Sequence, residues 1–203
     1  MSNVFNIPVQ NTSAEFKTLI AKAAKSLLND GIVVMPSDTI YGVFAGYCEK
    51  QIERLHLLKK RPVDKPFLLV FPEEYPLEEF VDMKALDVIG SQAIDKISEL
   101  WPGRNTIVLP KNPALKYPTG NTIAIRKPLK NDNVFFYETL NKYNKPLLAP
   151  SLNIHGSQPL VMLDEIKSIF SEIVDLIFYD QVFVPGLPSQ IWDLTKKPVV
   201  RLR

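Results

Sequence analysis

Residues 32–42 have the sequence Ile-Val-Val-Met-Pro-Ser-Asp-Thr-Ile-Tyr-Gly, in which a short apolar run leads into small polar side chains. The run from Ile32 to Met35 is apolar at every position, which is typical of a strand buried on both faces inside a sheet. We expect Pro36 to close that strand. Small hydroxyls at the carboxyl end of such a strand lie where α/β proteins usually bind ligands. A helix cap or a turn explains the same residue types without a ligand, so composition alone leaves both interpretations open.

The elements on either side of this stretch support an α/β fold. A helix is predicted over about 14–29, where apolar residues recur at helical spacing and Thr12 with Glu15 has the spacing of a capping box. Further strands and helices alternate down the chain, which indicates a mixed sheet with flanking helices. The remaining predicted helices cover about 50–59, 86–100, 133–143 and 163–171, and the remaining strands cover 67–71, 106–109, 122–125, 146–149, 173–179, 190–194 and 199–202.

Composition describes an ordinary globular protein. Of 203 residues, 46% are hydrophobic and 23% are charged, so we expect a single domain over 1–203. Lys and Arg number 24 against 22 Asp and Glu, and this balance argues against a surface that coats a polyanion. No run approaches the roughly 18 apolar residues of a membrane span, and no signal peptide is visible. We therefore expect a cytoplasmic protein with no membrane contact.

The rare residue types exclude several kinds of site. The only cysteine is Cys48 and the only histidines are His56 and His155, so an intramolecular disulfide cannot form and a Cys/His zinc site is excluded. No two of the 8 glycines lie two residues apart, and none precedes Lys-Ser or Lys-Thr. The dinucleotide fingerprint and the P-loop are therefore both missing. A nucleotide site would need another way to hold phosphate.

The basic run Lys59-Lys60-Arg61-Pro62 is one candidate for such a site. Pro62 biases Arg61 toward extended backbone. If Lys59 is extended as well, Lys59 and Arg61 project to one side and Lys60 to the other. Two converging cations can hold a triphosphate, with Arg as a bidentate fork and Lys as a point charge. A solvated basic helix end is the competing interpretation.

A second candidate follows the predicted strand at 146–149. In an extended segment Ser151 and Asn153 share a face, while Leu152 points the other way. A hydroxyl and an amide two residues apart can bind phosphate oxygens or ribose. Ser151 lacks the glycine elbow of a nucleophilic serine, so we disfavour a covalent mechanism and expect His155 to be a loop residue.

Taken in order, the polar stretches form a recognisable series: Ser-Asp-Thr-Ile-Tyr-Gly, Lys-x-Arg-Pro, Trp-Pro-Gly-x-x-Thr, Ala-Ile-Arg, Ser-x-Asn-x-x-Gly and Pro-Ser-x-Ile. The series resembles the YrdC-like family of threonylcarbamoyl-adenylate synthases from about residue 14 to 203. The resemblance implies a twisted, mostly open mixed sheet with flanking helices around a basic cavity. It leaves no room for the extra C-terminal domain of longer members.

The resemblance also implies an activity. Family members convert L-threonine, bicarbonate or CO₂, and ATP into threonylcarbamoyl-AMP and pyrophosphate. Downstream tRNA-modification proteins then use the adenylate to modify adenosine 37 of tRNAs that read codons starting with A, so a weak contact with tRNA is expected. Mg²⁺ is expected to arrive with ATP, held largely by phosphate and water. No protein nucleophile is required, because the carbamate of threonine attacks the α-phosphorus.

Carried over motif by motif, the resemblance assigns two sets of residues and no metal ligand. The ATP-binding set is Lys59, Arg61, Thr122, Ser151, Asn153 and Arg203, with Lys59 and Arg61 also catalytic. The threonine-binding set is Thr39, Lys65, Arg126 and Ser189, with Arg126 as the partner of the carboxylate. The chain departs from the family pattern at Ser37, Arg104, Leu152 and Gln190. Leu152 is the departure that matters most, since a side chain pointing into the cavity would weaken ATP binding.

Two alternatives stay open. One is a paralogue of the same fold that does not act as the main synthase for tRNA modification. The other is an RNA-binding module, for example one with a role in ribosome maturation, which would use the basic cavity without turnover. The paired Lys59/Arg61 and Ser151/Asn153 sets favour the synthase, because an RNA-binding surface does not need that spacing.

Overall fold

The computed structural model describes residues 3–154, 156–183 and 186–203. Within these ranges ten strands form one mixed sheet in the order β1-β8-β2-β3-β7-β4-β6-β5-β9-β10. The strands are β1 (Val4–Asn6), β2 (Val33–Pro36), β3 (Tyr41–Gly46), β4 (Leu69–Val70), β5 (Asn105–Pro110), β6 (Thr122–Arg126), β7 (Leu147–Leu148), β8 (Leu176–Tyr179), β9 (Gln190–Asp193) and β10 (Val200–Arg201). The predicted α/β fold with a mixed open sheet is confirmed.

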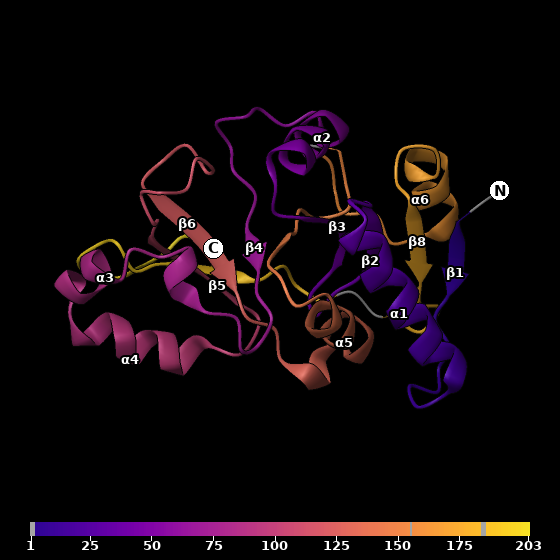
Figure 1. Ribbon diagram of the computed structural model, residues 1–203, viewed down its shortest axis with the longest axis horizontal. Coiled ribbons are helices and arrows are strands. Elements are labelled where there is room, and N and C mark those ends of the chain that lie inside the picture. Colours follow the sequence, from indigo (N-terminus) through magenta and orange to yellow (C-terminus); the bar gives the residue numbers. More distant parts are fainter. Residues whose placement is uncertain (1–2, 155, 184–185) are drawn as a thin grey trace.

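The helices lie on both faces of this sheet (Figure 1). They are α1 (Ala14–Leu28), α2 (Glu49–Lys59), α3 (Met83–Ile89), α4 (Ser91–Leu100), α5 (Val134–Tyr143) and α6 (Leu163–Phe170), with 3₁₀ turns at Leu77–Glu79 and Lys130–Asp132. Helices α1 and α5 pack against each other, with the Phe16 and Phe135 rings edge to face at 5.6 Å. Helices α3 and α4 lie near β5 and β6, at the other end of the sheet (Figure 1).

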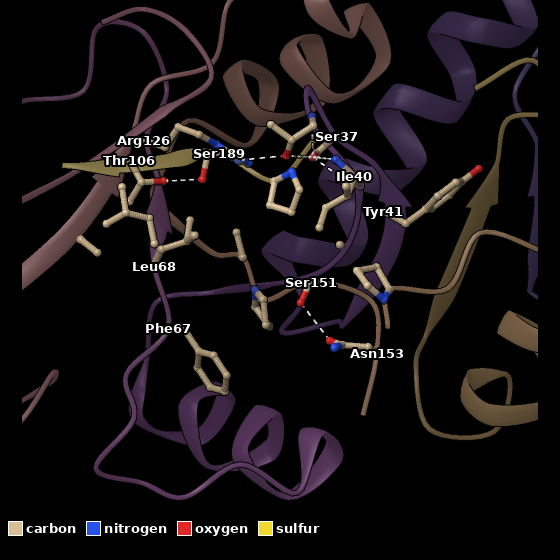
Figure 2. A pocket seen from close by; sticks show the side chains of 18 of the residues that line it. Ser37, Ile40, Tyr41, Phe67, Leu68, Thr106, Arg126, Ser151, Asn153 and Ser189 are labelled. Carbon is tan, nitrogen blue, oxygen red and sulfur yellow. Dashed lines mark hydrogen bonds between the residues drawn. The ribbon is translucent and has the colours of Figure 1, made fainter. Parts of the chain in front are cut away.

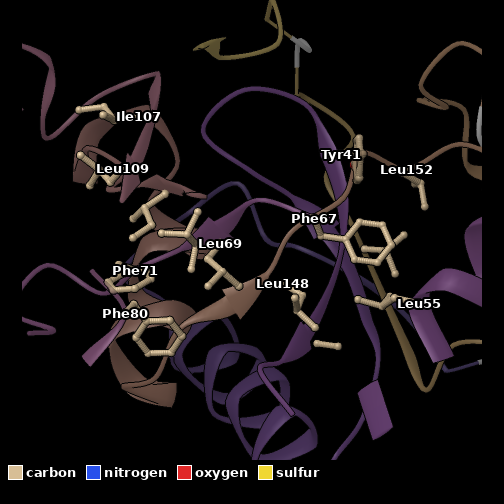
Figure 3. Packing of buried hydrophobic residues seen from close by; sticks show 14 of the residues in the cluster. Tyr41, Leu55, Phe67, Leu69, Phe71, Phe80, Ile107, Leu109, Leu148 and Leu152 are labelled. Carbon is tan, nitrogen blue, oxygen red and sulfur yellow. The ribbon is translucent and has the colours of Figure 1, made fainter. Parts of the chain in front are cut away.

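Strand β2 shows why the apolar run forms the centre of the sheet. Val33 and Met35 pack into the core cluster that includes α1 and α5, while Val34 packs into the cluster on the other face. All three side chains are fully buried. Figure 3 shows the second cluster, in which Leu55 of α2 and Leu152 lie near Phe67. A strand buried on both faces must be apolar throughout, as predicted.

Strand β3 was missed from the sequence. Residues 37–42 were interpreted as a segment following a strand, but the chain reverses over Ser37–Ile40 and pairs back antiparallel, with Pro36 opposite Tyr41. The Ser37 hydroxyl accepts from the Thr39 and Ile40 amides and donates to the Ile40 carbonyl at 2.6 Å, which stabilises this turn. The turn therefore holds Ser37 and Thr39 at the end of a β-hairpin.

Other local predictions need correction. The helix predicted over 86–100 is two helices, because Gly90 has φ +105°, which an L side chain rarely adopts. The strand expected at 67–71 is limited to β4, and β1 was not predicted. The cap of α1 is Ser13, whose hydroxyl accepts from the Phe16 amide at 3.0 Å, so the Thr12 capping box is wrong.

The extended geometry proposed for Lys59–Arg61 is also wrong. Lys59 is the last residue of α2, and Lys60 ends the helix in the left-handed conformation with φ 48°. The left-handed residue turns the chain so that Lys59 and Arg61 still line the same cavity, whereas Lys60 lines a different groove.

In the described ranges no helix combines the length and the apolar character needed to cross a bilayer.

Candidate functional site

A cavity of about 440 Å³ opens where β3, β5, β6 and the segment after β7 converge (Figure 2). Two groups of polar residues line it, and Figure 2 shows Ser151 and Asn153 set apart from Thr106, Arg126 and Ser189. We name the first group the Lys59 end and the second the Arg126 end. The Lys59 end consists of Lys59, Arg61, Ser151 and Asn153, and the Arg126 end consists of Ser37, Thr39, Thr106, Arg126 and Ser189.

The Lys59 end is held together by the lysine itself. The Lys59 ammonium donates to the Ser151 carbonyl, to the Asn153 carbonyl and to Asn153 Oδ1. Ser151 Oγ also donates to Asn153 Oδ1 at 2.8 Å. An ammonium has three N–H groups, so these three acceptors use all of them. Lys59 thus fixes the segment 151–153 and places a positive charge beside it.

Arg61 is placed differently. Its Nε donates to the Lys65 carbonyl at 2.7 Å and one terminal nitrogen donates to the Pro66 carbonyl at 3.1 Å. A guanidinium has five N–H groups, so three are left over within the described part of the chain. Arg61 is half-buried at the cavity wall and forms no ion pair with a carboxylate of the described residues. Its remaining donors are available to a ligand.

Burial changes the ionisation of Lys59. The side chain is 3% exposed, and removal from water lowers the pKa of Lys59 to about 7, with the charge of Arg61 adding to the effect. Near neutral pH the amine is therefore poised between its two states. An anionic ligand at this end would favour the charged form.

The Arg126 end is built on a buried ion pair. One terminal nitrogen of Arg126 lies 3.0 Å from Asp38 Oδ1, and the other donates to Thr39 Oγ1 at 3.0 Å. Burial lowers the pKa of Arg126 and raises that of Asp38, and each charge opposes the shift of the other. Arg126 Nε is buried without a hydrogen-bond partner among the described residues. A buried donor without a hydrogen bond costs free energy, and a ligand that accepts from Arg126 Nε would remove this cost.

The Thr39 hydroxyl can bind a ligand. Thr39 Oγ1 accepts from Arg126 at 3.0 Å and lies 3.2 Å from Ser37 Oγ. A hydroxyl oxygen has two lone pairs, so one is left for a ligand.

Ser189 and Arg203 complete the wall. The Ser189 hydroxyl lies 2.8 Å from Thr106 Oγ1, and the Ser189 carbonyl accepts from Arg203 Nε at 3.0 Å. Burial lowers the pKa of Arg203. Across the described residues the wall carries Lys59, Arg61, Arg126 and Arg203 and no carboxylate, so the cavity is basic.

Most of the predicted site residues meet in this one cavity. Eight line it, namely Thr39, Lys59, Arg61, Arg126, Ser151, Asn153, Ser189 and Arg203. Lys65 is exposed and away from the wall, where it contributes its carbonyl to Arg61. Thr122 shares a face of β6 with Ala124 and Arg126 but lies at the exposed start of the strand, beyond the cavity.

Leu152 points away from Ser151 and Asn153 into the core, as alternation along the segment predicted. It is fully buried in the core cluster beside Phe67, and it does not line the cavity. Sequence reasoning missed Ser37, Asp38 and Thr106 as members of the site. Thr106 stands within the quoted Trp-Pro-Gly-x-x-Thr stretch, which was the available signal. The prediction for His155 falls outside the described residues.

Comparisons with known proteins agree with this architecture. The model of the Sua5_yciO_yrdC family, described as "Telomere recombination", matches residues 25–203. A Vibrio vulnificus protein named threonylcarbamoyl-AMP synthase is 24% identical over 186 residues, covering 90% of this chain and 97% of the relative. A Yersinia enterocolitica protein of the same name is 26% identical, covering 80% and 85%.

Solved structures give the same picture. P. abyssi Sua5 complexed with L-threonine superposes with TM-score 0.82 at 26% identity, covering 98% of this chain. This chain spans only 56% of that protein. E. coli YciO superposes with TM-score 0.80 at 24% identity. The match covers 100% of this chain and 95% of the YciO chain, and it shows a likeness of fold.

The basic cavity in a ten-stranded mixed sheet thus defines a class of ligand-binding α/β proteins. The chain belongs to the Sua5/YciO/YrdC family within it, as its sequence motifs indicated. Its named curated relatives are enzymes.

Proposed function

We propose that this chain is a threonylcarbamoyl-AMP synthase, which joins L-threonine, bicarbonate or CO₂, and ATP into threonylcarbamoyl-AMP with release of pyrophosphate. The observation that carries the proposal is the polarity of the cavity. The Arg126 end offers an unpartnered donor at Arg126 Nε and an acceptor at Thr39 Oγ1. The Lys59 end offers two cations without a carboxylate partner among the described residues.

The Arg126 end suits an α-amino acid. Its carboxylate would accept from Arg126 Nε, which removes the cost of a buried unsatisfied donor. Its amine would donate to Thr39 Oγ1, which has a lone pair left after accepting from Arg126. The P. abyssi Sua5 structure is a complex with L-threonine, which supports threonine as the amino acid here.

The Lys59 end suits the triphosphate of ATP. Arg61 has three N–H groups left for phosphate oxygens, in the fork geometry that binds them bidentately. Lys59 supplies its charge and orders Ser151 and Asn153. Arg203, which donates to the Ser189 carbonyl at the Arg126 end, would reach toward the triphosphate from there. Thr122 and Lys65, which lie outside the wall, would reach the ligands only after moving inward.

The reaction then needs position and charge more than acid–base chemistry. The amine attacks the carbon of CO₂ and loses a proton to give the carbamate. A carbamate oxygen then bonds to the α-phosphorus as the bond to the bridging oxygen of the β-phosphate breaks, and pyrophosphate leaves with that electron pair. The chain would hold the carbamate and the phosphorus close together and neutralise charge on the phosphates.

Mg²⁺ is proposed to enter as its complex with ATP. The cavity wall has no carboxylate among the described residues, so phosphate oxygens and water would be its ligands. When bound, the ion would supply further neutralisation of the phosphates. Because ATP and tRNA are cytoplasmic, we place the reaction there. Downstream tRNA-modification proteins would consume the adenylate for adenosine 37, with tRNA contacting this chain only weakly.

Omission of single substrates tests the proposal. The purified chain is incubated with ATP, Mg²⁺, L-threonine and bicarbonate, and pyrophosphate is measured together with the mass of the adenylate. We expect pyrophosphate release that stops when either threonine or bicarbonate is left out. ATP binding without any threonine-dependent release would instead indicate the non-synthase paralogue. Salt-dependent RNA binding with no release would indicate the RNA-binding module.

A further inference from the structure

Two buried hydroxyls, one on β5 and one directly before β9, meet beside Arg126. Thr106 Oγ1 and Ser189 Oγ are 2.8 Å apart, and the two residues are 0% and 2% exposed. Thr106 lies on β5, directly opposite Arg126 of β6 and Ile191 of β9. Figure 2 shows the contact on the cavity side of these strands, next to the Arg126 side chain. The pair therefore belongs to the wall that would face the amino acid.

The surroundings decide which hydroxyl donates. Within the described part of the chain, Ser189 Oγ is the one hydrogen-bond partner of the Thr106 hydroxyl. If Ser189 were the donor, the proton of the fully buried Thr106 would have no acceptor, which costs a hydrogen bond. If Thr106 is the donor, the free proton is instead on Ser189, which is 2% exposed against 0% for Thr106 and lines the cavity. A ligand in the cavity can accept that proton, so the second arrangement leaves no proton unpaired once the site is filled.

We propose that Thr106 is a positioning residue, which fixes the Ser189 hydroxyl as a hydrogen-bond donor to the carboxylate of the amino-acid substrate. This inference rests on the proposed function and adds a residue to it. Ser189 and Arg126 Nε then present two donors to one carboxylate, while Thr39 accepts from the amine. A hydroxyl that accepts a hydrogen bond also becomes a better donor, because the two bonds polarise each other.

Removal of one hydroxyl tests the role. Thr106→Val keeps the β-branched shape that suits a strand and loses only the donor. Equilibrium binding of L-threonine should weaken about tenfold, the usual contribution of one hydrogen bond, while ATP binding changes less than about twofold. Thr106→Ser keeps the hydroxyl and should recover threonine binding to within about threefold. Thr106→Ala supplies a second hydroxyl-free variant, and thermal unfolding checks that each variant is folded.

A double-mutant cycle with Ser189→Ala separates positioning from direct contact. If Thr106 acts through Ser189, Thr106→Val should have no further effect on threonine affinity once Ser189 is Ala. Losses that simply multiply in the double variant would overturn the proposal, since Thr106 would then act independently of Ser189. Unchanged threonine binding by folded Thr106→Val and Thr106→Ala would overturn it as well. Failure of the unmodified chain to bind threonine would instead remove the proposed function, and this inference with it.

Discussion

The two ends of the cavity balance their charges in different ways. At the Lys59 end, Lys59 and Arg61 have no carboxylate partner within 4.0 Å among the described residues. At the Arg126 end, Arg126 is paired with Asp38 at 3.0 Å and surrounded by hydroxyls, and Arg203 donates to the Ser189 carbonyl. The first end has no carboxylate to offset its charge, whereas the second contains an ion pair, with Arg203 as its remaining cation among the described residues.

This difference matches two kinds of ligand. Uncompensated cations attract a polyanion such as a triphosphate, and part of their desolvation cost is recovered only when the anion binds. The Asp38–Arg126 ion pair and its neighbouring hydroxyls offer both hydrogen-bond donors and acceptors, which suits a zwitterion. The separation of the two ends also predicts which substitutions affect which ligand.

Amino-acid selectivity should show the largest effect. If the Arg126 end also hydrogen-bonds the substrate hydroxyl, valine leaves those polar groups unpaired and should be rejected by roughly 10⁴-fold in kcat/KM. Serine, which lacks only a methyl group, should lose roughly 1–3 kcal/mol of transition-state stabilisation. Pyrophosphate release measured with each amino acid compares the three. Equal turnover with valine would contradict the assignment of this end.

Loss of Arg61 at the Lys59 end should have the second-largest effect. Arg61→Ala should lower pyrophosphate release by about ten- to over a hundredfold, because a charge-assisted hydrogen bond contributes roughly 1.5–3 kcal/mol. Arg61→Lys should recover only part of the loss, because the fork is gone.

Lys60→Ala is the matched control for Arg61→Ala. Lys60 is exposed and lines a different groove, so this variant should stay close to full activity. If Lys60→Ala reduced turnover as much as Arg61→Ala, the segment would be a general basic patch, and the RNA-binding alternative would gain.

The Lys59 end should also respond to pH. Burial lowers the pKa of Lys59 to about 7, so above that pH the free protein holds a neutral amine. A bound triphosphate favours the ammonium, so binding then takes up a proton and the Kd for ATP should rise by up to about tenfold per pH unit. Titration of nucleotide binding between about pH 6 and 9 measures this. Lys59→Met removes the titrating group, and a wild-type profile identical to that of this variant would refute the assignment.

Cys48→Ala should have the smallest effect. The cysteine is exposed at the start of α2 and does not line the cavity. Nothing in the proposed reaction uses a thiolate. Activity should stay within about twofold, as pyrophosphate release will show, and a folded but inactive variant would reopen covalent catalysis.

The sequence predicted the elements whose signals are local. Helix α1 follows from apolar residues at helical spacing, and β2 from an unbroken apolar run. Strand β3 could not be separated from a loop, because its pairing depends on the turn that Ser37 stabilises. The break at Gly90 depends on a backbone conformation that periodicity does not reveal.

The site was predictable where motifs carried it and not where long-range contacts did. Alternation along an extended segment predicted that Ser151 and Asn153 share the cavity side and that Leu152 points into the core. Lys59 lines the cavity from the last residue of α2, and Arg61 lines it after the left-handed turn at Lys60, so extended geometry was not the reason for either. Thr106 meets Ser189 across 83 residues of chain, and no spacing rule in the sequence connects the two.

The most direct test of the two-ended cavity is whether substitutions at its two ends raise the KM values of different substrates. Arg61→Ala and Ser189→Ala are compared with the unmodified chain in steady-state pyrophosphate release, with ATP and threonine varied separately. We expect Arg61→Ala to raise the KM for ATP about tenfold or more with little change for threonine, and Ser189→Ala to do the reverse. If each variant raised both KM values equally, the cavity would be one undivided basic surface, and the assignment of its two ends would be wrong.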